Sequence, residues 1–64
     1  MVTLVPSSKA DLWTKNRINN RGPEFLVLGT GHPKCWGGRK ALHVREARGD
    51  WEGWFPAENV VIVE

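Results

Sequence analysis

Residues 41–60 read ALHVREARGDWEGWFPAENV, and this stretch decides the fold class. Leu42 and Val44 alternate with polar residues, which is the pattern of a half-buried β-strand. Residues 48–50, Arg-Gly-Asp, predict a tight hairpin turn with a positive φ at Gly49. Residues 51–55 then predict the returning strand, and the Pro-Ala-Glu-Asn sequence at 56–59 predicts a 3₁₀ turn.

Shorter apolar runs outside this stretch predict the remaining strands, at residues 2–5, 24–28 and 60–63. Residues 6–23 are polar and rich in asparagine. Asp11 could open a single helical turn there, but no helical period follows, so a long loop is expected. Five short strands predict an all-β fold, a small antiparallel barrel forming one domain over residues 1–64. The expected core is Leu4, Phe25, Val27, Leu42, Val44, Phe55, Val60 and Ile62.

The Gly-Trp-Phe-Pro sequence at 53–56, followed by Val60, resembles the second half of an SH3 domain in residue type and spacing. The order of loop lengths also fits that family: the loop at 6–23 takes the place of the RT loop, and the loop at 30–38 that of the n-Src loop. The resemblance implies a five-stranded SH3-like barrel of the bacterial or phage type, with a long RT-like loop and a 3₁₀ turn.

The sequence departs from SH3 domains that bind PxxP peptides on a groove of aromatic rings. The tryptophan that opens that family's third strand would fall near Ala41, and the tyrosine of its 3₁₀ turn at Asn59. Only Trp54 and Pro56 carry over from the groove. The RT-like loop is basic and would repel the arginine of a PxxP ligand, so conventional PxxP recognition is not expected. Its cations are Lys9, Lys15, Arg17 and Arg21.

Charge is distributed unevenly along the 64 residues, although the formal net charge is only +2. Residues 1–48 hold all nine Lys and Arg but three acids, whereas residues 49–64 hold four acids and no cation. Such asymmetry can steer an anionic partner toward one face of the domain; alternatively, the solvated charges only keep the protein soluble. The single cysteine, Cys35, excludes an internal disulfide, and no apolar run is long enough for a membrane span. We therefore expect a cytoplasmic protein without membrane contact.

Few residues suggest catalysis or metal binding. His32, Cys35 and His43 are soft ligands, but a structural zinc site needs four. A barrel of this size, filled by its own side chains, offers little room for a catalytic pocket. No enzymatic activity, metal or cofactor is therefore expected.

Two function classes remain for this sequence. The first is a module that binds an unidentified protein or larger assembly through exposed aromatic anchors; its candidate residues are Trp54, Pro56, Trp36 and Trp13. The second is a nucleic-acid-binding domain in which cations follow phosphates and an indole stacks on a base; its candidates are Lys34, Trp36, Arg39, Lys40, Arg45 and Arg48. Trp54→Ala is expected to abolish binding in the first class, and Trp36→Ala to weaken binding by about tenfold or more in the second. Alternatively, Trp36 folds back over the core and the cations are merely solvated.

Overall fold

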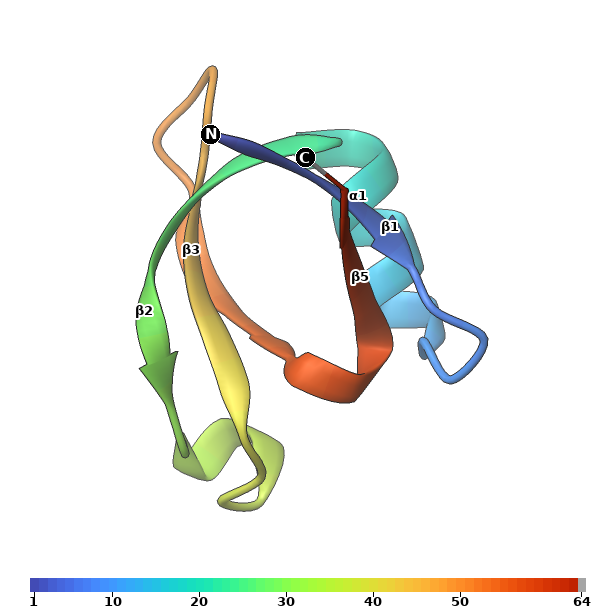
Figure 1. The fold of residues 1–64 in the computed structure, drawn as a ribbon, viewed down its shortest axis with the longest axis vertical. Helices are drawn as coiled ribbons and strands as arrows, with labels where there is room; N and C mark the ends of the chain where they lie inside the picture. The colour runs from blue at the N-terminus through green and yellow to red at the C-terminus, as the bar shows by residue number, and fades with distance from the viewer. Residues whose placement is uncertain (64) are drawn as a thin grey trace.

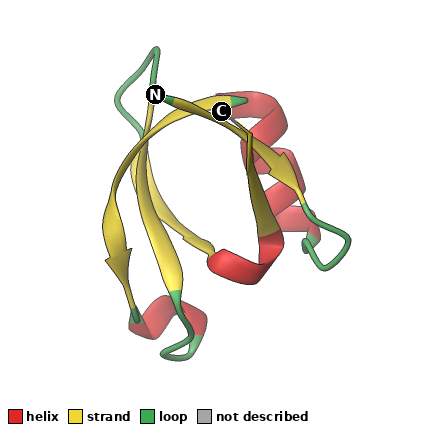
Figure 2. Cartoon of the chain, in the orientation of Figure 1, coloured by secondary structure: helices red, strands yellow, loops and turns green. Residues whose placement is uncertain are grey.

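One strongly curved antiparallel sheet organises the computed structural model, which describes residues 1–63 (Figure 1). Its strands follow the order β4-β3-β2-β1-β5. The strands are β1 (Val2–Pro6), β2 (Glu24–Gly31), β3 (Ala41–Glu46), β4 (Glu52–Pro56) and β5 (Val60–Val63). A helix, α1 (Leu12–Arg21), joins β1 to β2, and the 3₁₀ turns η1 (Lys34–Trp36) and η2 (Ala57–Asn59) precede β3 and β5 (Figure 2).

The all-β class with five antiparallel strands and a 3₁₀ turn before the last strand is confirmed. The alternation along β3 also holds, because Leu42 and Val44 are buried, whereas His43 is half-buried and Arg45 is exposed. The sheet is not closed into a barrel. Its two outer strands, β4 and β5, pair only with β3 and β1 respectively. The predicted barrel is therefore an open, curved sheet.

Two phenylalanine rings occupy the centre of the core. Phe25 and Phe55 are fully buried and meet edge to face with their centroids 5.4 Å apart. Six of the eight expected core residues are buried, and Ile18 joins them from α1. Val27 and Ile62 are wrong as core residues, since they are 40 % and 45 % exposed. β1 pairs with only the first two residues of β2, so it does not extend alongside Val27. Ile62 lies on β5, an outer strand of the sheet.

The expected loop over residues 6–23 is wrong, because this segment contains the ten-residue helix α1. Asp11 is its N-cap, and the Asp11 side chain accepts a 2.8 Å hydrogen bond from the backbone N–H of Thr14. Thr14 and Ile18, one turn apart, are the buried residues of α1. The Nδ2 of Asn59 donates to the Thr14 hydroxyl at 3.5 Å, which connects the helix to η2. Packing and capping therefore stabilise a helix that hydrophobic periodicity does not reveal.

Removing this cap by Asp11→Ala is expected to lower the free energy of unfolding by about 0.5–2 kcal/mol at pH 7. The side chain and backbone N–H of Thr14 hydrogen bond to the Asp11 carboxylate and lower its pKa. A pKa lower in the folded than in the unfolded chain stabilises the fold above the unfolded value, near pH 4, and this contribution is lost as pH falls through the folded value. Urea unfolding should show that the free energies of unfolding of parent and variant differ less at pH 3 than at pH 7.

The matched control is Asp50→Ala, which removes an acid whose contact with Arg45 is fully exposed to solvent. Its free energy of unfolding should stay within about 0.5 kcal/mol of the parent. Equal stability of the Asp11 and Asp50 variants at pH 7 would contradict the capping role.

The β3–β4 turn contains glycine for a reason other than the predicted one. Gly49 has no positive φ; in residues 1–63 only Gly37 and Gly38 do. A Cβ at Gly49 would overlap the Glu46 carboxylate, with its Cδ only 2.6 Å away. Glu46 is buried, and its Oε1 accepts a 3.1 Å hydrogen bond from the backbone N–H of Trp51. The turn therefore needs glycine to make room for a buried carboxylate.

Candidate functional site

All four tryptophans contribute to one groove, although they come from distant parts of the chain. Trp13 lies on α1, Trp36 on η1, Trp51 just before β4 and Trp54 within β4. The groove has a volume of about 370 Å³, and apolar atoms dominate its lining. We call it the tryptophan groove; it is lined by Trp13, Cys35, Trp36, Trp51, Gly53 and Trp54.

The indole of Trp13 connects the helix, the groove and the core. It meets the Trp36 ring edge to face at a centroid distance of 5.3 Å, and it lies 6.2 Å from Trp51. It also meets buried Phe55 edge to face at 5.8 Å. Trp13 is nevertheless 39 % exposed, so part of its ring remains available to a ligand.

The other indoles are held against β4. Nε1 of Trp36 donates a 3.0 Å hydrogen bond to the Trp54 carbonyl, which ties η1 to this outer strand. The Trp51 ring lies against Gly53, where an added Cβ would come within 2.5 Å of ring carbon Cζ2. These contacts leave the rings little freedom, so a ligand would meet a preformed surface.

The Trp54 ring lies on the outer face of the sheet, since alternation along β4 places it opposite buried Phe55. It stacks on His43 with centroids 4.6 Å apart and an interplanar angle of 17°. Nε2 of His43 lies 3.2 Å from Oε2 of Glu52. Trp54 therefore contacts Trp36 through its backbone carbonyl, while its indole stacks on His43.

The guanidinium of Arg17 lies at the border between the groove and α1. The Arg17 guanidinium carbon lies 5.1 Å from the centroid of Trp13 and 5.0 Å from that of Trp51, within the range of cation–π attraction. No acidic residue lines the groove. Among residues 1–63, neither Arg17 nor Lys34, the first residue of η1, forms an ion pair. The border of the groove is therefore positively charged.

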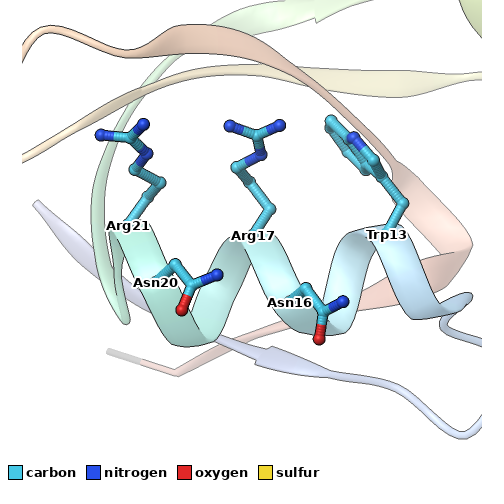
Figure 3. Close-up of a pocket in the computed structure, with 5 residues that line it drawn as sticks. All are labelled: Trp13, Asn16, Arg17, Asn20 and Arg21. Carbon is cyan, nitrogen blue, oxygen red and sulfur yellow. The ribbon is translucent and has the colours of Figure 1, made fainter.

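A second hollow, of about 300 Å³, lies along α1 (Figure 3). Trp13, Arg17 and Arg21 form one row of side chains on the helix, and Asn16 and Asn20 form a second (Figure 3). Trp13 lines both hollows, so the two surfaces adjoin.

The structure brings together three of the four residues predicted to bind a protein, Trp13, Trp36 and Trp54. The fourth, Pro56, is fully buried, so it cannot serve as a surface anchor. It ends β4 opposite Ala41, another fully buried residue. Trp51, Cys35 and Gly53 also line the groove, although the sequence analysis named none of them as a binding residue; Trp51 also packs against the core. Trp36, a candidate in both function classes, and Trp54, a candidate in the protein-binding class, both line this groove.

The residues predicted to bind nucleic acid do not form one patch. Lys34, Arg39 and Lys40 lie before β3 and Arg48 lies after it, so they occupy opposite ends of that strand (Figure 1). Three of the cations also meet acids: Arg39 contacts Glu58, Arg45 lies 3.7 Å from Asp50, and Arg48 lies 3.5 Å from Glu24. This segment lacks the continuous basic surface that the prediction assumed.

No group of three or more metal-ligating side chains occurs within residues 1–63. In the same part of the chain, no helix has the length and apolar character needed to cross a membrane. The sequence matches no protein-family model, and comparisons with curated proteins and with solved structures gave no match. The site is therefore interpreted from its own geometry.

Proposed function

We propose that this chain is a divergent SH3-like, non-enzymatic interaction module that binds an extended segment of a partner protein in the tryptophan groove. The strand order, the long β1–β2 connection and the 3₁₀ turn between β4 and β5 support the SH3-like assignment. The resemblance implies that partners bind on a groove of aromatic rings, and this chain carries such a groove beside β4.

The observation that carries the proposal is the convergence of Trp13, Trp36 and Trp51 around a preformed apolar groove. Partly exposed indoles provide large, rigid contact area, and tryptophan is enriched among the residues that dominate binding energy. Gly53 and Trp54 of the outer strand β4 line the groove, so an extended segment would lie beside this strand. An apolar side chain of the partner would enter it and displace water from the rings.

The charges around the groove define the partner further. Arg17 and Lys34 favour carboxylates beside the apolar anchor and disfavour the arginine of conventional PxxP ligands. The basic helix stands where SH3 domains place an acidic loop. The preferred segment is therefore apolar at its centre and acidic at its flanks.

Selection of a random peptide library on the purified protein tests this proposal. Selected peptides should combine a large apolar side chain with Asp or Glu nearby, and calorimetry should give micromolar affinity. Trp36→Ala should weaken binding at least about tenfold, since tenfold corresponds to about 1.4 kcal/mol. The indole N–H signal of Trp36 in the unaltered protein should shift on titration, because a ligand in the groove changes its surroundings.

The matched control is Leu28→Ala, which removes an apolar side chain that is 48 % exposed on β2, outside the groove. Its affinity should stay within about twofold of the parent. Selected peptides that bind Trp36→Ala as tightly as the parent would contradict the proposal. Selection that yields no peptide tighter than millimolar would also contradict it.

A further inference from the structure

The outward face of α1 has a composition that the tryptophan groove does not explain. Successive residues of a helix are turned by about 100°, so the buried stripe of Thr14 and Ile18 fixes which side faces solvent. Asparagines occupy the side opposite this stripe, flanked by cations. Asn16, Asn19 and Asn20 share this side with the exposed Leu12; Lys15 lies at one flank and Arg17 at the other, whereas Arg21 lies beside the buried Thr14.

Asparagine is a poor choice for an exposed helix, because it favours turns and caps and has a lower helix propensity than Ala, Lys or Glu. Within residues 1–63, none of the three asparagines forms a side-chain hydrogen bond. Their amides therefore do not stabilise this fold. An unused set of donors and acceptors that weakens its own helix is a feature expected of a binding surface.

The charge on this face is of one sign. Residues 12–21 contain three cations and no acid. Asp11 caps the N-terminus of the helix, and Glu46 lies 3.9 Å from Arg21 and partly offsets its charge, whereas Lys15 and Arg17 form no ion pair within residues 1–63. A polyanion approaching α1 would therefore meet amides along the centre and positive charge at both flanks.

We propose that α1 binds duplex DNA, with its asparagine face in the major groove. Ten residues give a helix about 15 Å long, and the major groove of B-DNA, about 12 Å wide, admits a helix. Asn16 and Asn20, one turn apart, can each pair with N6 and N7 of adenine. Lys15 and Arg17, on opposite flanks, meet the phosphates of the two strands.

Duplex DNA fits this face better than RNA or single strands do. The major groove of A-form RNA is too narrow for a helix. Single-strand binding relies on the stacking of successive bases, and this face offers one ring, Trp13, which already packs against Trp36 and Phe55. This inference goes beyond the proposed protein-binding function and stands independently of it, since Lys15, Asn16, Asn19 and Asn20 do not line the tryptophan groove.

Mobility-shift titration of a 30-base-pair random duplex, with the full chain, tests the inference. Binding should be micromolar at 50 mM salt and about fortyfold weaker at 200 mM, which is the loss expected for about three phosphate contacts. The double variant Asn16→Ala/Asn20→Ala should weaken binding at least tenfold. Alanine favours the helix, so thermal unfolding should show no loss of stability, and misfolding would not explain weaker binding.

The matched pair Lys15→Gln and Lys40→Gln compares equal charge losses on and off the helix. Lys15→Gln should lower the salt slope by about one unit, whereas Lys40→Gln should leave it unchanged. No duplex binding at 50 mM salt, or a larger effect from Lys40→Gln, overturns the inference. Tighter binding of single-stranded DNA that is lost with Trp36→Ala also overturns it and assigns nucleic acid to the groove. Peptide binding should be unaffected by the asparagine variant, which separates this test from that of the proposed function.

Discussion

Val44→Asp is expected to abolish folding. Val44 is fully buried in the middle of β3, with Val27 on one neighbouring strand and Gly53 on the other. A carboxylate there has no cationic partner, and the effective penalty for burying an ion is several kcal/mol. A domain of this length is stabilised by only about 3–10 kcal/mol. Far-UV circular dichroism and proton NMR dispersion at 25 °C should therefore show an unfolded chain.

The same substitution at an exposed β-branched residue provides the control. Val61→Asp places a carboxylate on β5 at a position that is 49 % exposed, so the variant should fold. A folded, monomeric Val44→Asp variant would show that the buried and exposed faces of β3 are reversed.

Gly22→Ala is expected to destabilise the protein by about 1–3 kcal/mol, the usual effect of overpacking. A Cβ at Gly22 would overlap the Phe25 ring, with its Cζ 2.9 Å away, and would lie 2.9 Å from the carbonyl oxygen of Ile18. Phe25 is fully buried at the centre of the core, so its ring cannot move aside easily. Urea unfolding should show a lower midpoint with an unchanged slope.

Gly29→Ala is the matched control, because a Cβ there would have no neighbouring heavy atom within 4 Å. Gly29 lies in β2 with a negative φ, so alanine should be neutral or slightly stabilising. Equal unfolding midpoints for the two alanine variants would show that the ring of Phe25 yields to the added methyl group.

The strands are predictable from sequence because each depends on a local signal. Alternation reveals β3, and the Pro-Ala-Glu-Asn turn separates β4 from β5. The exposure of Val27 and Ile62 has no local signal. The exposure of Val27 depends on how far β1 extends along β2, and that of Ile62 on the position of β5 at the edge of the sheet. Only the tertiary arrangement determines both features.

The helix was missed because its buried stripe contains only Thr14 and Ile18, one of them polar. An amphipathic helix normally shows three or four apolar residues in two turns, and this one does not. The pairing of Asp11 with Thr14 three residues later is a local N-cap signal that could have indicated a helix start. The Asn-rich sequence that follows outweighed this signal.

Each tryptophan could be recognised as a candidate anchor, but their convergence could not be predicted. Trp13 reaches the groove because α1 replaces the expected loop, and Trp36 reaches it because η1 turns its indole toward the Trp54 carbonyl. Pro56 was misplaced for the opposite reason: its spacing matches a binding motif, but its side chain is fully buried.

The gathering of three of the four indoles, Trp13, Trp36 and Trp51, has an optical consequence. Intrinsic emission excited at tryptophan wavelengths reports on these three rings and on Trp54 at the outer face, whereas far-UV dichroism reports on the backbone of the whole sheet. Because Trp13 and Trp51 also contact Phe55 in the core, at 5.8 and 5.6 Å, the two thermal transitions should coincide. An emission transition at lower temperature would mean that α1 separates from β4 while the strands remain paired, so the protein carries its own built-in probe of helix docking.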